Sequence, residues 1–336
     1  MAGTMKAVDI KEGKGPASNL FINDKTPKPK PSKSQAIVKV KSFGLNRMDL
    51  LQREGKYPLP PQAGPILGVE FSGTIEEFGE DAEKGFKIGD EVFGLVYGGA
   101  YAEYIAVSTH MLIHKPSHLS WEEAAGIPET WITATQALYL VGGFSEGKTV
   151  LWHAGASSVS IAGQQLSHSS GAKAVYATTR QDEKNKWLES ELKTTKAFNQ
   201  TGDWATQVLE ATDGQGVDLI IDFLGATTFG GNLKALAKDG VMVCLGQMGG
   251  SVLPEGVNIG PLVFKRIRVE GSTLRSRDET YQGKLRDQLV DHAMPKFEDG
   301  SFKIIIEKVM PWEKIQEAHE LMESNQTKGK IICKIS

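Results

Sequence analysis

The fold of this chain is decided by Thr149-Val150-Leu151-Trp152-His153-Ala154-Gly155-Ala156-Ser157-Ser158-Val159-Ser160. Its first residues, Thr149 to Trp152, form an apolar run typical of a buried strand. The amphipathic stretch Val159 to Ser170 follows, and Gly171 ends it. A turn of small residues at a helix N-terminus is where a dinucleotide-binding protein holds a pyrophosphate. The sequence therefore predicts a phosphate-binding turn that consists of Gly155, Ala156, Ser157, Ser158 and Val159.

This turn departs from the Gly-x-Gly-x-x-Gly pattern because only its first glycine, Gly155, is present. Ser157 and Ser160 occupy the other two positions. A small residue still lets the backbone approach a ligand, and serine adds a hydroxyl for a phosphate oxygen. The alternative is an ordinary strand-to-helix turn that binds nothing. The alternating strands and helices around the turn favour the phosphate-binding interpretation.

Strands and helices alternate on both sides of this turn. The strand Ala174–Thr178 and the helix Asp182–Leu192 follow it, with Asp182 as the expected N-cap. Val217–Phe223 and Val241–Leu245 are nearly continuous apolar runs, which suit central parallel strands covered on both faces. The pattern predicts an α/β fold with a doubly wound parallel sheet.

The two ends of the chain have a different pattern. The first third carries short apolar runs separated by Gly and Pro, and Thr26–Lys33 is expected to be a surface connection. After Gly271 the sequence predicts a helix at Glu279–His292, a strand at Ile304–Ile306, a helix at Trp312–Ser324 and a strand at Ile331–Ile335. The expected strands of the first third are Ile37–Val40, Gly73–Ile75 and Glu91–Gly94.

Composition limits the classes of protein that this chain can belong to. Its 336 residues suit two domains, at about 150 residues each. With 38 basic and 41 acidic residues, the net charge of −3 argues against a general nucleic-acid binder. Cys244 and Cys333 cannot build a disulfide framework, which favours a reducing, cytoplasmic location. The N-terminus lacks the apolar region of a secretory signal, and no apolar run reaches the length of about 20 residues that a membrane span needs.

Several segments together resemble the medium-chain dehydrogenase/reductase superfamily, in its quinone oxidoreductase branch, and the resemblance covers essentially the whole chain. These segments are Gly44–Leu50, Gly68–Gly73, Gly89-Asp90, Ala100–Tyr104, Ile127–Trp131, Leu274–Asp278, and Asn325 with Lys328-Gly329-Lys330. The resemblance implies a Rossmann domain at residues 126–271, inserted into a GroES-like β-barrel domain. The barrel domain would consist of residues 1–125, completed by residues 272–336. Family members usually form homodimers through the Rossmann domain.

The metal ligands of the zinc-dependent relatives are missing from the matching positions. Those relatives carry a histidine where Gly68-Val69-Glu70 has valine, and a cysteine or aspartate where Asn46 and Arg47 stand. A structural zinc site would need four cysteines, and the chain has two. The histidines His110, His114 and His118 are expected to be scattered, because Pro116 interrupts any helix there. The sequence therefore predicts an enzyme without metal.

The end of the second strand of the doubly wound sheet indicates which cofactor would bind. An NAD-selective Rossmann domain carries Asp or Glu there, whereas this chain has Thr178-Thr179-Arg180, followed by Lys184. Hydroxyl and cationic donors suit the 2′-phosphate of NADPH. The alternative is that Arg180 and Lys184 only begin a solvated helix, and the neighbouring Asp182 and Glu183 support it.

The resemblance also implies the residues that line the rest of the site. Those around the nicotinamide would be Asn46, Ile127, Thr130 and Thr133. The strand ends would contribute Phe223, Leu224, Gly225, Gly246, Gln247, Met248, Gly249 and Gly250, and the site would be closed by Leu274, Arg275, Ser276 and Lys328. Tyr57 is the expected substrate residue, since its ring can stack on a planar acceptor while its hydroxyl donates a hydrogen bond. The alternative is a tyrosine that packs beneath a proline loop.

These observations predict an NADPH-dependent quinone oxidoreductase that transfers a hydride in the cleft between two domains, with Tyr57 and Asn46 as its catalytic residues. Water can protonate the product oxygen, so a dedicated general acid is not obligatory, and the sequence shows no convincing acid–base pair. Two alternatives stay open. One is an enoyl or alkenal reductase that acts on α,β-unsaturated carbonyls, and the other is an NADPH-binding protein without activity.

Overall fold

The computed structural model describes residues 3–82 and 85–336, which form two compact units. The inserted unit is the continuous segment Thr133–Leu274, and the terminal unit combines Met1–Ile132 with Arg275–Ser336. Both boundaries lie slightly later in the chain than the predicted ones at 125/126 and 271/272. The long helical segment from Pro128 explains the first difference, because α3 (Pro128–Thr135) runs across the boundary between the units.

The inserted unit is built on a six-stranded parallel sheet with the strand order β10-β9-β8-β11-β12-β13. Its strands are β8 (Thr149–Trp152), β9 (Ala174–Thr179), β10 (Lys196–Asn199), β11 (Val217–Asp222), β12 (Leu236–Cys244) and β13 (Arg268–Gly271). The order starts at β8 in the middle and proceeds outward in both directions, so the sheet is doubly wound. The predicted fold class is confirmed.

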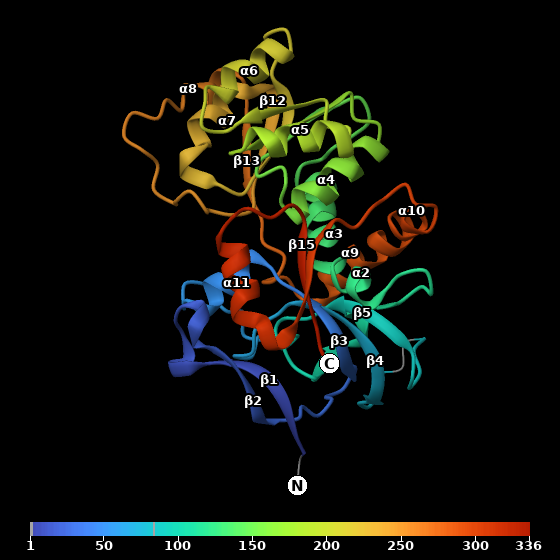
Figure 1. Ribbon diagram of the computed structural model, residues 1–336. Helices are drawn as coiled ribbons and strands as arrows, with labels where there is room; N and C mark the ends of the chain where they lie inside the picture. The colour runs from blue at the N-terminus through green and yellow to red at the C-terminus, as the bar shows by residue number, and fades with distance from the viewer. Residues whose placement is uncertain (1–2, 83–84) are drawn as a thin grey trace. The chain divides into compact units, whose positions relative to one another are not determined.

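Helices cover the sheet of the inserted unit on both faces (Figure 1), as the fully buried strand β9 requires. They are α4 (Ser158–Ser169), α5 (Asp182–Glu191), α6 (Trp204–Ala211), α7 (Phe229–Ala235) and α8 (Gly260–Phe264), and the π-helical segment Gln136–Val141 follows α3. The prediction of Asp182 as N-cap was wrong, since Gln181 holds that position. The Asp182 carboxylate instead accepts a hydrogen bond of 2.8 Å from the side chain of Asn199.

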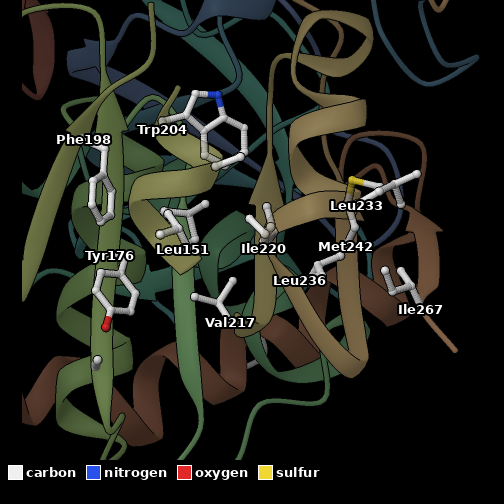
Figure 2. Close-up of a cluster of buried hydrophobic side chains, with 14 residues drawn as sticks. Leu151, Tyr176, Phe198, Trp204, Val217, Ile220, Leu233, Leu236, Met242 and Ile267 are labelled. Carbon is white, nitrogen blue, oxygen red and sulfur yellow. The ribbon is translucent and has the colours of Figure 1, made fainter. Parts of the chain in front are cut away.

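Large apolar side chains from the central strands and two helices form the core of the inserted unit (Figure 2). Leu151, Ile220 and Met242 come from three adjacent strands, while Trp204 and Leu233 come from α6 and α7. All five are buried. Burying a side chain of this size contributes about 1.5–3 kcal/mol, so this cluster holds the sheet and its helices as one body.

The terminal unit joins the two ends of the chain in one sheet with the order β14-β15-β3-β4-β5-β7, while β6 also pairs with β3 and β1 and β2 form a separate hairpin. Its strands are β1 (Thr4–Ile10), β2 (Leu20–Pro27), β3 (Gln35–Gly44), β4 (Glu70–Phe78), β5 (Glu91–Leu95), β6 (Tyr104–Ser108), β7 (Leu112–His114), β14 (Ile306–Pro311) and β15 (Lys330–Lys334). In Figure 1 the red strand β15 lies beside the blue strand β3, and Ile332 pairs with Gly44 in an antiparallel register.

The helices of the terminal unit are short, apart from α9. They are α1 (Arg47–Arg53), α2 (Trp121–Ala125), α9 (Glu279–His292), α10 (Met294–Glu298) and α11 (Ile315–Glu323). The strand predicted at Ile304–Ile306 was misplaced, because pairing with β15 begins only where Ile306 faces Lys330. The predicted connection Thr26–Lys33 is shorter than expected, since β2 extends through Pro27. Within the described residues, no helix combines the length and the apolar character that crossing a membrane requires.

Gly163 in α4 makes a testable contribution to stability, because a Cβ atom there would overlap the ring of Trp152. We expect Gly163→Ala to lower the free energy of unfolding by about 1–3 kcal/mol through overpacking. Helix propensity alone predicts the opposite sign, since Ala is favoured over Gly by about 1 kcal/mol in a helix. The measurement is urea unfolding followed by circular dichroism.

Gly230→Ala in α7 is the matched control. There the nearest atom to an added Cβ would be Val257 Cγ1 at 3.9 Å, so we expect equal or higher stability. A Gly163→Ala variant as stable as Gly230→Ala would contradict the close packing of α4 on Trp152.

Candidate functional site

The turn between β8 and α4 is held tightly against the next strand and helix. The Gly155 N–H donates a hydrogen bond of 2.8 Å to the Thr178 carbonyl. A Cβ on Gly155 would lie 2.7 Å from the Ala177 Cβ and 2.8 Å from Leu188 Cδ1. Ala154, just before it, has a positive φ of 47°. Glycine at position 155 is therefore required by the packing of the turn against β9 and α5.

The N-terminus of α4 presents backbone donors in the manner of an anion site. Ser157 is its N-cap, and the Ser157 hydroxyl lies 3.4 Å from the Ser160 N–H and 3.1 Å from the Ser160 hydroxyl. The Ser157 side chain therefore caps the helix. Ser158 and Val159 hold the first two helical positions, whose N–H groups have no intrahelical acceptor. These N–H groups and the dipole of a 12-residue helix suit a phosphate.

At the end of β9, the threonine hydroxyls are used in contacts within the protein, while the cations that follow them are more exposed. The Thr178 hydroxyl lies 2.7 Å from His153 Nδ1. The Thr179 hydroxyl donates within the strand-to-helix connection, where it has two acceptors, Asn185 Oδ1 at 2.7 Å and the Gln181 carbonyl at 2.8 Å. Both threonines thus shape the connection from within. The cations that follow them are the exposed Arg180 and the half-buried Lys184 in the first turn of α5.

A buried histidine connects the ends of three strands. His153 Nε2 lies 2.7 Å from Asn232 Oδ1, and the amide nitrogen of Asn232 donates to Asp222 Oδ2 at 3.0 Å. The oxygen of this amide therefore faces the ring, which places the ring proton on Nε2 and leaves Nδ1 to accept from Thr178. Burial lowers the pKa of His153, which keeps the ring neutral. The arrangement fixes β8, β9 and β11 relative to one another.

The segments after β11 and β12 fold onto each other through backbone contacts. Asp222 accepts from the Leu224 N–H at 2.8 Å and from the Gly225 N–H at 3.3 Å. The Met248 N–H donates to the Phe223 carbonyl at 3.0 Å, and the Gly249 N–H donates to the Leu224 carbonyl at 2.8 Å. The strand-end residues predicted for the cofactor, including Gly246, therefore gather at one edge of the sheet, together with the turn of α4 and the end of β9.

The terminal unit holds a buried cluster of charged and polar residues around Asn46. The Asn46 side chain donates to Glu70 Oε1 at 2.9 Å and accepts from Lys330 Nζ at 3.0 Å. Lys330 Nζ also donates to the Leu45 carbonyl at 3.0 Å and forms an ion pair with Glu70. Lys330 is only 2% exposed and Glu70 is fully buried. Hydrogen bonds at both the nitrogen and the oxygen of the Asn46 amide therefore fix its orientation.

Two further carboxyl groups belong to this buried cluster. Asp49 Oδ2 accepts from the Asn46 N–H at 2.8 Å and from the Tyr101 hydroxyl at 3.1 Å, and burial raises the pKa of Asp49 to about 6. The Glu129 N–H, in the first turn of α3, donates to Glu70 Oε2 at 2.9 Å. Burial, and next to it the charge of Glu70, raises the pKa of Glu129 to about 7.

Tyr57 lies over a buried guanidinium in the same unit. The Arg275 Cζ is 5.3 Å from the centroid of the Tyr57 ring, and Arg275 Nε donates to the Tyr97 carbonyl at 2.7 Å. Arg275 is 4% exposed, whereas the Tyr57 side chain is half-buried. Burial raises the pKa of Tyr57, and the charge on Glu129 raises it further. The hydroxyl of Tyr57 therefore keeps its proton at neutral pH and can act as a donor.

The remaining predicted residues are divided between the two units. The Thr130 hydroxyl donates to the Gly126 carbonyl at 2.9 Å within its own helix. Thr133 begins the inserted unit and Leu274 ends it, while Ser276 is exposed in the terminal unit. Lys328 is half-buried, and its N–H donates to Glu307 at 2.8 Å.

Family comparisons match both parts of the chain. Residues 32–117 match the alcohol dehydrogenase GroES-like domain, and residues 192–333 match the zinc-binding dehydrogenase family. A zinc-type alcohol dehydrogenase-like protein of Schizosaccharomyces pombe is 30% identical over 335 residues, which cover 90% of this chain and 91% of that protein. A quinone oxidoreductase of Lama guanicoe is 27% identical over 98% of this chain and 97% of its own length.

The chain belongs to the medium-chain dehydrogenase/reductase superfamily, in its quinone oxidoreductase branch. It is an oxidoreductase of this superfamily, with a GroES-like domain. An acryloyl-coenzyme A reductase of Sulfurisphaera tokodaii is also similar, at 26% identity over 98% of this chain and 100% of that protein.

Solved structures agree with the superfamily assignment. A Pseudomonas syringae quinone oxidoreductase has a TM-score of 0.84 and 27% identity, covering 98% of this chain and 99% of its own. A mycobacterial protein solved with NADPH has a TM-score of 0.85 and 26% identity, with the same coverage. An NAD-dependent alcohol dehydrogenase has a TM-score of 0.85 and 29% identity, covering 99% of this chain and 100% of its own.

A nicotinamide dinucleotide, the cofactor of this superfamily, fits the residues of the inserted unit. The packed turn at Gly155 and the open N–H positions of Ser158 and Val159 form a cradle for a pyrophosphate. Across residues 3–82 and 85–336, no group of three or more His, Cys, Asp or Glu side chains could hold a metal ion. Val69, at the position of the zinc-binding histidine in zinc-dependent relatives, is buried.

Five residues that the structure makes important carried no clear sequence signal. Glu70 and Lys330 stood inside recognised segments, but nothing in the sequence shows that their side chains meet. The glycine that lets α4 pack closely on β8 is Gly163. It lies three positions after Ser160, where the Gly-x-Gly-x-x-Gly pattern has its last glycine. The residues with these unpredicted roles are Glu70, Glu129, His153, Gly163 and Lys330.

The Lys330–Glu70 pair can be tested through stability. We expect Lys330→Met to lower the free energy of unfolding by about 3–5 kcal/mol, since it leaves a buried carboxylate without its cation. Adding Glu70→Gln to this variant removes the charge and should restore part of the loss. Chemical unfolding of both variants measures the difference. A double variant less stable than Lys330→Met alone would contradict the proposed pairing.

Proposed function

We propose that this protein reduces a quinone with NADPH and uses no metal. The observation that carries the proposal is the pairing of Tyr57 with the buried guanidinium of Arg275. A quinone is planar, and its oxygen becomes negative as it accepts a hydride. An aromatic ring can stack on the plane, and a buried cation stabilises the developing charge.

The preference for NADPH rests on the end of β9. No carboxylate stands at its last residue, Thr179, and the exposed Arg180 follows. Lys184 lies in the next turn of the chain, at the start of α5. A 2′-phosphate adds negative charge to the adenosine ribose, which two cations favour. The acidic Asp182 would disfavour a 2′-phosphate, but its carboxylate already accepts a hydrogen bond from the Asn199 side chain.

When NADPH is bound, its nicotinamide supplies the hydride. The turn at Gly155 and the N-terminus of α4 would hold the pyrophosphate, with Arg180 and Lys184 at the 2′-phosphate. Tyr57 and Arg275 would orient the acceptor and stabilise its oxygen. Asn46, whose amide is fixed by Glu70 and Lys330, would be a rigid part of the site.

We also propose that two copies associate through the inserted unit. β13 lies at the edge of its sheet, and α8 just before it carries exposed apolar side chains. Val263 is 75% exposed and Phe264 is 81% exposed. A second copy that covers this edge would bury both side chains and pair the strand.

The proposed activity is tested by NADPH oxidation over ortho-quinones, para-quinones and enones, with and without a chelator. We expect turnover with quinones that persists in the chelator, because Val69 and Asn46 stand where the zinc-dependent relatives carry metal ligands. Turnover with enones alone would favour an enoyl reductase. Tight NADPH binding with no turnover on any acceptor would favour a binding protein without activity, and activity lost in the chelator and restored by zinc would contradict the metal-free assignment.

Cofactor preference is tested by Arg180→Ala combined with Lys184→Ala. Losing charge-assisted contacts costs about 1.5–3 kcal/mol, so the Michaelis constant for NADPH should rise by roughly 10- to 150-fold. The constant for NADH should stay nearly unchanged. Lys186→Ala, an exposed lysine on the same helix, is the control. Equal effects on NADPH and NADH would show that these side chains do not contact the 2′-phosphate.

A further inference from the structure

The segment that follows Leu274 is held to Tyr97 at two points. Arg275 Nε donates a hydrogen bond of 2.7 Å to the Tyr97 carbonyl, and the Tyr97 hydroxyl donates one of 2.8 Å to the Arg277 carbonyl. All three residues belong to the terminal unit, and Tyr97 is only 8% exposed. Tyr97 thus fixes the start of the returning chain through both its backbone and its side chain.

The Arg275 guanidinium has few other restraints on its orientation. It is 4% exposed, yet in the part of the chain that the structure describes its Nη2 has no hydrogen-bond partner. Its Nη1 makes a weak contact of 4.0 Å with the sulfur of Met48. A hydrogen bond from a charged group to an oxygen is stronger than such a contact. The bond to the Tyr97 carbonyl therefore sets the orientation of the guanidinium.

The end of β5 fixes the position of Tyr97 in turn. The Val96 N–H, next to it in the chain, donates to the Val69 carbonyl at 2.8 Å. Gly98 follows, and a Cβ there would lie 3.3 Å from Arg275 Nη2. Glycine at this position therefore allows the chain after β5 to approach the guanidinium closely.

We propose that Tyr97 is a positioning residue for the reaction. Its carbonyl orients the Arg275 guanidinium, and its hydroxyl holds the chain on the far side of Arg275 through the Arg277 carbonyl. The inference rests on the proposed quinone reduction, in which Arg275 stabilises the oxygen that hydride transfer makes anionic. A donor that is oriented beforehand needs no reorganisation when the charge develops. Tyr97 acts on the reaction through Arg275.

The Tyr97 hydroxyl can be removed without disrupting the fold. Burial, and then the charges of Glu279 and Asp278, raise the pKa of Tyr97 to about 12, so the hydroxyl keeps its proton and donates at neutral pH. The Arg277 carbonyl also accepts a hydrogen bond of 3.0 Å from Gln282 Nε2. Tyr97→Phe therefore leaves this carbonyl with a donor and keeps the buried ring. We expect this variant to fold, with a melting temperature within a few degrees of the wild type.

The first measurement uses the protein without cofactor or acceptor. Heteronuclear NMR follows the exchange of the Arg275 Nε–H with water, and the signal is assigned by its loss in Arg275→Met. A hydrogen bond to a buried carbonyl slows this exchange, so loosening the segment should speed it about tenfold in Tyr97→Phe. The control is Tyr104→Phe, which changes a half-buried tyrosine on β6 of the same unit and should leave the exchange unchanged.

Kinetics with a quinone and NADPH provide the second measurement. Tyr97→Phe should lower kcat about tenfold, because a loosely held guanidinium stabilises the developing charge less well. Both Michaelis constants should stay nearly unchanged, as is typical when an interaction made only in the transition state is lost. In an Arg275→Met background, Tyr97→Phe should cause no further fall, because the group that Tyr97 orients is already gone. Tyr104→Phe should behave as the wild type.

The two measurements separate the positioning role from the proposed function. Faster exchange with a lower kcat in Tyr97→Phe, and no further fall in the Arg275→Met background, would support the inference. Wild-type exchange and kcat in Tyr97→Phe would overturn it while leaving quinone reduction intact. A tenfold fall that persists in the Arg275→Met background would also overturn it, since Tyr97 would then act by another route. A wild type that reduces no quinone would overturn the proposed function, and the positioning role with it.

Discussion

A buried ammonium needs an acceptor for each of its N–H groups, and in this chain that requirement joins the two ends of the sequence. Lys330 begins β15, yet its acceptors lie on Glu70, Leu45 and Asn46, at the start of β4 and just after β3. Gly44 has no side chain because a Cβ there would overlap the Glu70 carboxylate. The geometry of the terminal unit therefore depends on one cation that only the last strand can supply.

The inserted unit fixes its strand ends through hydrogen bonds and without an ion pair between them. His153 connects to Thr178 on one side and through Asn232 to Asp222 on the other. Hydrogen bonds in a buried chain strengthen one another, so a network of this kind can specify geometry as well as an ion pair does. The two units thus reach the same rigidity by different means. The charged cluster alone has groups that can exchange a proton near neutral pH.

The sequence was most informative where local pattern and tertiary position coincide. Periodicity predicts the strand Thr149–Trp152, the helix after it and the helix Glu279–His292. The spacing of the apolar residues shows which face of each element is buried. The hairpin of β1 and β2 could not be predicted in this way, since only Leu20 of the eight residues in β2 is buried. The start of β14 was missed because pairing alone sets this boundary, where Ile306 faces Lys330 at the start of β15.

In the candidate site too, the sequence predicts the residues that belong to a local pattern and misses those that tertiary contacts bring together. The turn at Gly155 and the cations after β9 were found because their meaning depends on adjacent residues. Glu70, Glu129 and Lys330 are widely separated in sequence, and their importance comes from burial beside one another, which no local pattern records. The resemblance implied Lys328 as a site residue, whereas no signal in the sequence pointed to the side chain of Lys330. The pairing of β15 with β3 brings Lys330 beside the residues that follow β3.

The discontinuous origin of the terminal unit has a consequence for how the protein is made. The inserted unit is one uninterrupted segment and can fold as soon as it leaves the ribosome. β3 must wait for β15, and the intervening chain, residues 45–329, takes roughly 15–60 s to synthesise at about 5–20 residues per second. During that interval the β3 edge that will receive β15 has no partner strand and offers a surface for chaperones or for aggregation.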